Sequence, residues 1–366
     1  MMINQVYSSK ILFWSKVIST LLLPYYSFFN LFRKKYLLGH FTVKTILVTE
    51  YHRIGDILMI IPALTSLRKT FPESRLILLC SKSARPLAEN LNLADEIISV
   101  KVPWTEWRWS LSRWVRMWIF ARKLSKKGID LAFDFKGDLR NSWFLWHTNP
   151  KISYGYATTG GEYFFTNAHL MNQGSHQSTR ANTLVKKAGC NLIANNISKT
   201  NINTNGAIVF HNGATDPRRS WPVVHWVKLA RLLSVKHKVS VVKLPESEAL
   251  IKQLKDEGIG VEYFEGSIID FKNWLKNQQC IISPDSMAGH LAAHIGIPTI
   301  SIFGSQNPKQ THPVNNLGTI IRPDSICEHQ SDHWRLCKSC MESISSEKVF
   351  NATINLLSRL KTDQEI

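Results

Sequence analysis

Short apolar runs alternate with helix-like stretches along the chain, and the alternation occurs in two series. The first series predicts helices at Asp56–Arg68 and Ala84–Leu91, and strands at Ile46–Thr49, Leu76–Cys80, Glu96–Val100 and Ile129–Phe135. The second predicts helices at Trp221–Leu233, Glu246–Glu257 and Met287–Ile295, and strands at Ala207–Phe210, Val239–Lys243, Cys280–Ser283 and Thr299–Phe303. Runs this short and apolar are typical of strands buried on both faces. Each series therefore predicts a doubly wound parallel sheet of the α/β class.

The length of the chain suits two domains, because 366 residues exceed the ~100–200 residues of a usual domain. Residues 191–205 are rich in Asn, Ser and Thr and separate the two series as a linker. We therefore predict one Rossmann-like lobe at 41–190 and a second, ending in a terminal helix, at 206–366. Sheets of this kind bind ligands beyond the carboxyl ends of their strands, so we expect a central cleft between two facing lobes.

The charge balance indicates an anionic partner. The formal net charge is +18, and a strongly basic surface attracts nucleic acid, anionic membranes or phosphorylated substrates. We expect no nucleic-acid partner, because the sequence has no helix-turn-helix, finger or RNA-binding signature. The six cysteines lack the dense spacing of a secreted disulfide scaffold, which favours a reducing, cytoplasmic location.

The first forty residues form an apolar and basic segment. Ile11–Phe32 is apolar but is interrupted by Lys16 and Pro24, and no acidic residue precedes Glu50. A spanning helix needs ~20 largely uninterrupted apolar residues. We therefore expect residues 1–40 to lie on an anionic membrane surface. A helix packed on the first lobe is the main alternative, and a membrane span is a weaker one.

A Trp- and Arg-rich insert lies near 104–122. Its residues Trp107, Leu111, Trp114 and Trp118 recur at helical spacing and are flanked by Arg108, Arg113, Arg116 and Arg122. An amphipathic, cationic helix anchored by Trp suits the headgroup layer of a membrane. A helix buried in the fold and a nucleic-acid surface with stacking aromatics are the alternatives.

A glycine and an aspartate follow the first predicted strand. Gly55 at the strand-to-helix turn would let the backbone approach a ligand, and Pro62 is expected in the first turn of the helix, where it is tolerated. Asp56 could be the general base for an acceptor hydroxyl. Its position alone, however, favours an aspartate that caps the helix.

A basic loop connects the first strand and the first helix of the second series. It offers a tight turn, a hydroxyl and two adjacent guanidinium groups, at Gly213, Thr215, Arg218 and Arg219. These groups suit a diphosphate. A solvated basic loop in which Ser220 caps the next helix is an equal alternative.

The loop after Cys280–Ser283 leads into a helix N-terminus, where backbone amides attract an anion. Asp285 could accept hydrogen bonds from sugar hydroxyls or cap that helix. His290, one turn further, could reach the cleft or be an ordinary packed histidine. Gly304, after the next strand, belongs to another loop at the same sheet edge.

Three cysteines cluster near the C-terminus, at Cys327, Cys337 and Cys340, with His329 and His333 between them. A C-x2-C pair with an upstream cysteine could bind zinc. The spacing matches no usual zinc finger, so we expect free or buried thiols and no metal. No cofactor is predicted elsewhere in the chain.

Together these segments resemble glycosyltransferase family 9, the lipopolysaccharide heptosyltransferases. The resemblance is carried by R-I-G-D-I-L-x3-P-A-L-x2-L-R-x2-F-P at 53–72, D-F-K-G-D-L-R-N-S at 134–142, H-N-G-A-T-D-P-R-R-S-W-P at 211–222, and S-P-D-S-M-A-G-H-L-A-A-H-I-G-I-P-T-I-S-I-F-G at 283–304. The ending C-x2-C-M-x2-I at 337–344 is also similar. The match runs from about Lys44 onward; residues 1–40 and the Trp-rich insert fall outside it.

The resemblance implies a GT-B fold with the acceptor in the first lobe and the donor in the second. It implies inverting, metal-independent transfer of a heptose from ADP-heptose to an acidic inner-core acceptor of lipopolysaccharide or lipooligosaccharide. The enzyme would be peripheral on the inner face of the cytoplasmic membrane. Asp56 matches the proposed catalytic aspartate of the family, and Arg219 falls where the family places a basic residue on the donor phosphates.

The resemblance also implies a set of further contacts. Those expected at the donor phosphates are Thr215, Arg218, Ser286, Met287, Ala288 and Gly289; at the donor sugar or nucleotide, Gly213, Asp285, His290 and Gly304; and at the acceptor, Arg53, Gly55, Lys136 and Arg140.

The chain departs from the family pattern in two donor loops. The family usually reads H-P-G where this chain has H-N-G at 211–213, and D-T-G-P-M-H where it has D-S-M-A-G-H at 285–290. One alternative function is therefore a GT-B transferase that uses a different nucleotide sugar on another glycolipid or capsule acceptor. Another is a catalytically inactive, membrane-associated binding protein, which the presence of Asp56 and Arg219 disfavours.

Overall fold

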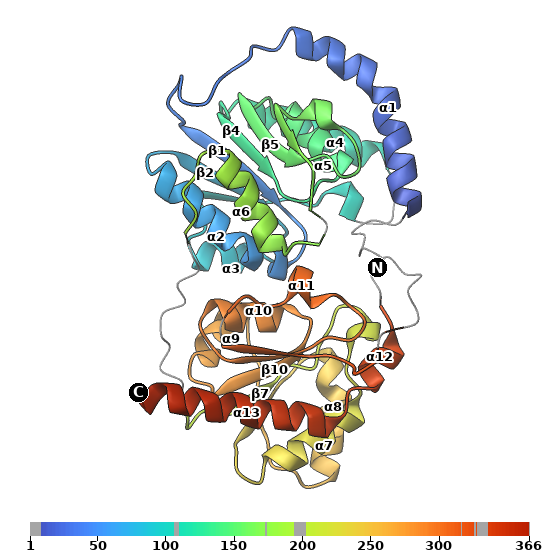
Figure 1. Cartoon of the computed structure of the whole chain (residues 1–366), viewed down its shortest axis with the longest axis vertical. Coiled ribbons are helices and arrows are strands. Elements are labelled where there is room, and N and C mark those ends of the chain that lie inside the picture. Colours follow the sequence, from blue (N-terminus) through green and yellow to red (C-terminus); the bar gives the residue numbers. More distant parts are fainter. Residues whose placement is uncertain are drawn as a thin grey trace. The chain divides into compact units, whose positions relative to one another are not determined.

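The computed structural model describes residues 9–105, 110–172, 174–193, 203–315, 317–325, 327 and 336–365. They divide between two compact units, within Gln5–Ala194 and within Asn195–Ile366, which we call the N-lobe and the C-lobe (Figure 1). The division falls inside the segment 191–205. Predictions that concern Trp107, Arg108, His329 and His333 lie outside the described residues, as does most of the linker.

Six parallel strands form the sheet of the N-lobe, in the order β3-β2-β1-β4-β5-β6. The strands are β1 Thr45–Glu50, β2 Arg75–Cys80, β3 Glu96–Ser99, β4 Leu131–Asp134, β5 Ile152–Tyr156 and β6 Asn167–His169. The helices are α1 Ser9–Leu31, α2 Ile54–Thr70, α3 Arg85–Asn90, α4 Leu111–Ser125, α5 Leu139–His147 and α6 Gln177–Lys187, with 3-10 turns η1 Pro103–Thr105 and η2 Glu162–Phe164. The strand order reverses between β1 and β4, so the loops after these two strands leave the sheet side by side.

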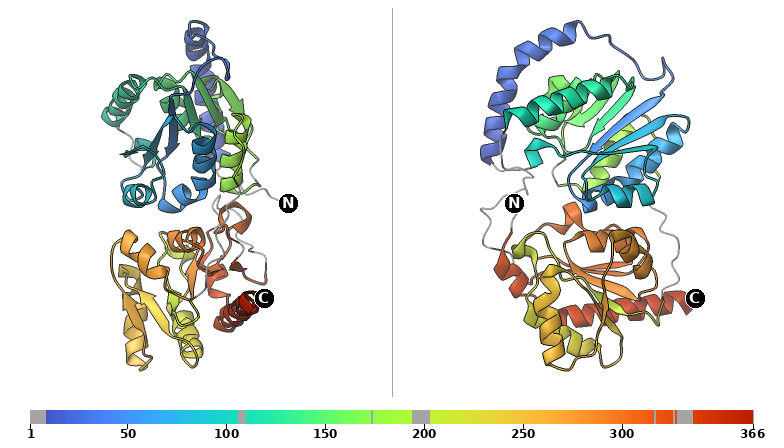
Figure 2. Two further views of the ribbon diagram at one scale, coloured as in Figure 1. Left: turned by 90° about the vertical axis from the view of Figure 1, so that its left-hand side faces the viewer. Right: turned by 180° about the vertical axis from the view of Figure 1, so that it is seen from behind.

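Helices cover both faces of the N-lobe sheet (Figure 2). Side chains alternate along a strand, so Ile46 and Val48 of β1 pack in the core with α2 and α6. Leu47, between them, packs in the core that α4 and α5 share with the opposite face. Burial on both faces explains why the strand reads as a continuous apolar run.

The C-lobe repeats this topology, with the strand order β12-β11-β10-β7-β8-β9. Its strands are β7 Ile208–Phe210, β8 Val239–Val242, β9 Glu262–Phe264, β10 Cys280–Pro284, β11 Thr299–Ile302 and β12 Gly318–Ile321. Its helices are α7 Val223–Leu233, α8 Glu248–Asp256, α9 Ile268–Leu275, α10 Met287–His294, α11 Pro308–Thr311, α12 Lys338–Glu342 and α13 Ser346–Glu365, with 3-10 turns η3 Pro217–Arg219 and η4 Pro245–Ser247. The terminal helix α13, red in Figure 1, packs on α7, β11 and β12. The predicted doubly wound parallel sheets are confirmed in both lobes.

Two predictions about α2 are wrong. The helix begins at Ile54, with Arg53 as its N-cap residue, so Gly55 lies in the first helical turn and not in the loop before it. Pro62 lies in the interior of the helix, where its ring removes one helical hydrogen bond. The missing N–H of Pro62 is the one that would donate to the carbonyl of Leu58, four residues earlier.

The first helix, α1, packs along the outside of the N-lobe through one polar and aromatic face (Figure 1). Gly161 N donates to the hydroxyl of Ser19 at 2.8 Å, and Tyr26 is buried. The opposite face leaves large apolar side chains exposed at helical spacing, namely Trp14, Ile18, Leu21, Tyr25, Phe28 and Phe32. By length and composition alone, α1 is the one helix of the described residues that could cross a membrane.

The described part of the Trp-rich insert forms the helix α4. It begins at Leu111, with Ser110 as its N-cap residue, and carries Leu111, Trp114 and Trp118 of the predicted apolar face. Met117, Ala121 and Leu124 point into the core. The large apolar side chains that remain exposed on α4 are Leu111, Val115, Trp118 and Ile119. The helix therefore combines a buried face with an exposed apolar one.

Candidate functional site

A group of buried and half-buried charged side chains forms where β1 and β4 end in the N-lobe. The ammonium of Lys136, just after β4, donates to Asp56 Oδ1 at 2.7 Å. It also lies 3.2 Å from Oε2 of Glu50, the last residue of β1, and donates to Gln177 at 3.2 Å. Glu50 is only 1% exposed. We call Glu50, Asp56, Asp134 and Lys136 the N-lobe cluster.

The third residue of α2, Asp56, is held as an ionised carboxylate. Its Oδ2 accepts a hydrogen bond from the Arg53 amide at 3.0 Å, so Asp56 caps the helix from inside its first turn and is not the N-cap residue. Burial alone would raise the pKa of Asp56, but Lys136 and His52 outweigh it and hold that pKa well below its usual range. The pKa of Lys136 is raised in return, because Asp56 and Glu50 outweigh the effect of its burial.

The carboxyl group of Asp134, at the end of β4, is in the opposite electrostatic situation. Its side chain is fully buried, and burial, with added repulsion from Asp138 and Glu50, raises its pKa to about 7. It accepts hydrogen bonds from the Lys136 amide at 3.2 Å and from Asn141 at 3.3 Å. Asp134 therefore fixes the turn that carries Lys136 toward Asp56.

The structure brings only part of the predicted acceptor set together. Arg53 and Gly55 flank Asp56 in sequence, but the Arg53 side chain is exposed while Gly55 is buried. Arg140 pairs with Asp138, through Nε to Oδ1 at 2.8 Å and NH2 to Oδ2 at 2.5 Å. Lys136 is thus the predicted acceptor residue that the structure places directly on Asp56.

At the equivalent position of the C-lobe, the loops after β7 and β10 meet. Arg219, the last residue of η3, donates through NH1 to Oδ2 of Asp285 at a long 3.4 Å. Asp285 follows β10 directly and is 9% exposed. Because Ser286 is the N-cap residue of α10, Asp285 does not cap that helix. The predicted donor residues Arg219 and Asp285 therefore lie together at the end of two adjacent strands.

The N-terminus of α10 has the features of an anion site. Ser286 does not cap the helix with its side chain, and its buried hydroxyl has no hydrogen-bond partner among the described residues. The amides of Met287, Ala288 and Gly289 occupy the first turn, which has no intrahelical acceptor. A Cβ on Gly289 would lie 3.1 Å from both Pro313 and Ser283, so a side chain there would have to displace these neighbours by a few tenths of an ångström.

The loop after β7 divides its predicted residues between two roles. Arg218 is bound by its own neighbour, because both Nε and NH2 reach Asp216 at 3.0 and 2.9 Å. This pairing lowers the pKa of Asp216 to about 2. Thr215 is exposed. Ser220 does not cap the next helix, since Pro222 is the N-cap residue of α7.

Two buried polar residues, His211 and Asn212, begin this loop. Burial lowers the pKa of His211 to about 4, so the imidazole is neutral at pH 7. The amide group of Asn212 bridges to η4: it donates to the Glu246 carbonyl at 3.1 Å and accepts from Ser247 at 2.6 Å. Asn212 thus ties the donor-side loop to η4 at the position where the family usually has proline.

The remaining predicted donor residues have packing roles that the sequence did not reveal. A Cβ on Gly213 would lie 2.6 Å from Leu244, and one on Gly304 would lie 2.9 Å from the sulfur of Met341. His290 is buried in α10. The three clustered cysteines, Cys327, Cys337 and Cys340, lie together.

Residues that the sequence-based prediction missed are mostly buried polar groups at strand ends. Glu50, Asp134 and Gln177 contact or position Lys136, yet none was assigned a role. One signal was present: Glu50 and Asp134 are acidic residues that end apolar strand patterns, and such a position lies at the ligand-binding edge of a parallel sheet.

Comparison with known proteins identifies the family. A family model described as glycosyltransferase family 9 (heptosyltransferase) matches residues 117–338, more than half of the chain. The chain belongs to glycosyltransferase family 9. It is 22% identical over 305 residues to lipopolysaccharide heptosyltransferase 1 of Pseudomonas aeruginosa, covering 77% of this chain and 84% of that protein.

Solved structures with the same fold include Escherichia coli heptosyltransferase WaaC with ADP, at a TM-score of 0.69 and 18% identity, covering 85% of this chain and 99% of that one. WaaC with ADP-2-deoxy-2-fluoro heptose aligns at a TM-score of 0.67 and 18% identity, with the same two shares covered. The expected GT-B fold class is confirmed, and family membership makes the protein a glycosyltransferase.

Proposed function

We propose that this family 9 glycosyltransferase moves a heptose from ADP-heptose to an acidic inner-core acceptor of lipopolysaccharide or lipooligosaccharide, with inversion and without a catalytic metal. The observation that carries the proposal is the pairing of Asp56 with Lys136 at the ends of β1 and β4. It supplies an ionised base beside a cation. The named relatives support the sugar and the acceptor class.

The Asp56 carboxylate is the general base of the proposed reaction. It takes the proton of the acceptor hydroxyl while that oxygen bonds to the anomeric carbon and the bond from this carbon to the diphosphate breaks. The bound Lys136 lowers the pKa of Asp56 and so weakens it as a base. A phosphate or carboxylate of the acceptor would pair with Lys136 and relieve this effect, so that the base gains strength when the acceptor binds.

The C-lobe binds the donor in this proposal. ADP leaves with charge developing on its diphosphate, and Arg219 and the first-turn amides of α10 stabilise that charge. Asp285, which the ion pair holds beside Arg219, accepts hydrogen bonds from the sugar hydroxyls. Arg218 is already paired with Asp216 and therefore contributes less to binding of the diphosphate.

The N-lobe also lies on the inner face of the cytoplasmic membrane in this proposal. The exposed apolar stripe of α1 is accompanied by Lys10, Lys16, Arg33, Lys34 and Lys35, a combination that suits an anionic interface. The opposite face of α1 is fastened to the lobe, for example by the hydrogen bond from Trp146 to Asn30 at 2.9 Å. An interfacial helix therefore fits better than a spanning one.

The donor is tested by calorimetry on the purified protein with ADP-heptose, UDP-sugars and GDP-sugars. A clear preference for ADP-heptose supports the proposal. Preference for another nucleotide sugar would replace it with the alternative transferase, a possibility raised by the altered loops at 211–213 and 285–290. Failure to bind any of them would favour the inactive binding protein.

Membrane association is tested by flotation with vesicles of phosphatidylglycerol and phosphatidylcholine. Replacing Leu21 and Phe28 of the exposed stripe by Glu should reduce the bound fraction several-fold at unchanged transfer to a soluble acceptor. A control with Val235→Glu, an equally exposed apolar residue of the C-lobe, should bind like wild type. If wild type, the double variant and the control float equally, α1 does not contribute to membrane binding.

A further inference from the structure

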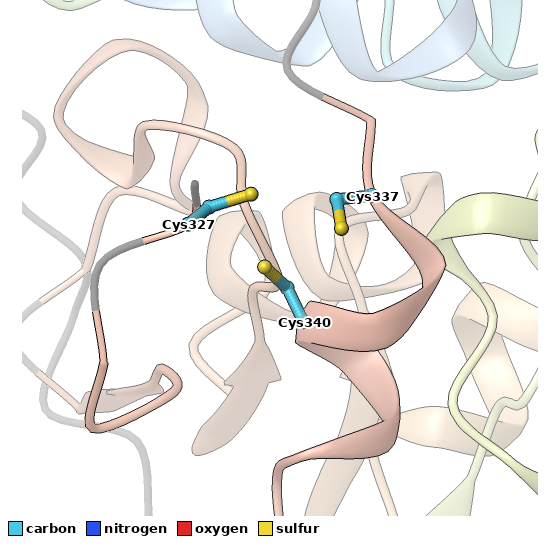
Figure 3. A group of neighbouring side chains, drawn as sticks. All are labelled: Cys327, Cys337 and Cys340. Atoms are coloured by element: carbon cyan, nitrogen blue, oxygen red, sulfur yellow. The ribbon is translucent and has the colours of Figure 1, made fainter. Parts of the chain in front are cut away.

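The cysteines near the C-terminus form a compact group that the proposed reaction does not use. The sulfur atoms of Cys327, Cys337 and Cys340 all lie within 4.8 Å of one another. Cys337 is the N-cap residue of α12 and Cys340 lies within that helix, while Cys327 comes from the chain beyond β12. Figure 3 shows the three side chains converging, with their sulfur atoms toward one another.

The other cysteines of the chain show that this grouping is not a general property of its thiols. Cys80 and Cys190 lie in the apolar core of the N-lobe, and Cys280 lies in that of the C-lobe. Each of them occupies an ordinary core position, where cysteine behaves as a small apolar residue. Only the C-terminal three form a metal-ligating group among the described residues.

The spacing of the three sulfur atoms suits a shared metal ion better than a disulfide. Thiolates ~2.3 Å from a tetrahedral ion lie about 3.8 Å apart, so the observed group needs only a small contraction to close around one. A disulfide would join two of the sulfur atoms and would leave the third thiol unused. Zinc and iron both prefer thiolate ligands in this geometry.

We propose that Cys327, Cys337 and Cys340 together bind one thiolate-preferring metal ion, zinc or iron, as a structural centre of the C-lobe. Binding releases the thiol protons. The three thiolates fill three of the four positions of a tetrahedral ion.

The centre would fasten the C-terminal segment to two donor-side loops. The amide of Cys337 donates to Ser305 at 2.9 Å, and Met341, next to Cys340, packs on Gly304. Further along, Trp221 donates from its indole nitrogen to the Ile344 carbonyl at 2.8 Å, and α12 contacts η3, which carries Arg219. Metal binding does not depend on the proposed function, but its effect on donor affinity does.

Metal content is the primary test. The full-length protein, purified under reducing conditions without chelators, is analysed by plasma mass spectrometry, which distinguishes zinc from iron. We expect about one ion per chain, and at least a five-fold lower content in Cys337→Ser and Cys340→Ser. Cys190→Ser is the matched control and should keep the wild-type content. A wild-type protein that stays metal-free after reconstitution with zinc or iron(II) would overturn the proposal.

A second measurement uses only the folded wild-type protein, because the serine variants could fail to fold. A thiol-blocking mercurial should release the ion in one step. The released ion is measured with a metal-sensitive dye. In a separate sample that has not been treated with the mercurial, removal of the metal by a chelator should lower the melting temperature and weaken ADP binding several-fold. Adding the metal back should restore both. Unchanged melting after complete metal loss contradicts a structural centre. If the loaded protein keeps its metal but binds no nucleotide sugar, the proposed function fails and the metal site stands.

Discussion

The two lobes share one topology but place different chemistry at the same point of it. In each sheet the strand order reverses between the first and fourth strands of the lobe, β1 and β4 in one and β7 and β10 in the other. The N-lobe places two carboxylates on Lys136 there, Asp56 at 2.7 Å and Glu50 at 3.2 Å. The C-lobe offers a helix N-terminus and Arg219, which is held at 3.4 Å from Asp285.

The difference shows how a repeated fold divides a transfer reaction. A buried carboxylate group can accept a proton from an acceptor hydroxyl, whereas a helix N-terminus with a guanidinium group can hold a diphosphate. The fold supplies the position, and the residues that follow each strand supply the chemistry. Variants that affect one lobe and spare the other can therefore test the division.

The largest effect is expected from Asp56→Asn. Loss of the general base should lower kcat by about 10²–10⁴-fold, while calorimetric donor binding stays unchanged because the donor belongs to the other lobe. Asp95→Asn, which removes a partly exposed carboxylate paired with Arg68, is the control and should remain active. Near-normal turnover in Asp56→Asn would exclude Asp56 as the base.

Arg219→Ala should weaken ADP binding about 10- to 100-fold, which is the usual contribution of a hydrogen bond to a charged group. Its neighbour provides a matched control: Arg218→Ala should change binding less than three-fold, because Asp216 already holds that side chain. The measurement is calorimetry with ADP. Equal losses in both variants would show that the two arginines share the diphosphate.

Lys136→Met should move the acidic limb of the pH profile of kcat/KM upward by more than one pH unit. The reason is that Lys136 is the main group lowering the pKa of Asp56, and burial alone would raise it. Without the ammonium, the base is protonated at higher pH. Lys127→Met, a change to a lysine paired with Glu96, should leave the limb where it is; an unmoved limb in Lys136→Met would contradict the coupling.

The smallest effects concern stability, where the lobes should respond to pH with opposite signs. The pKa of Asp134 is raised in the folded state to about 7, so its contribution to stability falls as the pH rises from about 4 to 7. The pKa of His211 is lowered to about 4, so its contribution is present above pH 6.5 and is lost as the pH falls toward 4.

The two signs are tested by measuring the free energy of unfolding of wild type and of each variant between pH 4.5 and 6.5. Relative to wild type, Asp134→Asn should gain stability with rising pH and His211→Gln should lose it, each by at most about 1.4 kcal/mol per pH unit. Slopes of the same sign would show that one of the two groups does not titrate as its burial implies.

The sequence by itself determined the α/β class, the two series and eight of the twelve strands of the described residues. Buried strands such as β1 and β10 are readable because both faces are apolar, and a strand-end loop follows each of them in sequence. It did not reveal edge strands such as β6 and β9, in which no side chain is fully buried and which therefore lack an apolar run. Nor did it reveal α5 and α6, where polar residues interrupt the apolar pattern.

Only the tertiary structure decided which polar groups meet. Asp56 and Lys136 lie eighty positions apart in the chain and come together because β1 pairs with β4. The same is true of Arg219 and Asp285 through the pairing of β7 with β10. The grouping of Cys327, Cys337 and Cys340 likewise depends on how α12 packs beside the loop after β11, where the Cys337 amide donates to Ser305. Local pattern sets secondary structure, whereas contacts between distant residues depend on strand order, which no local pattern contains.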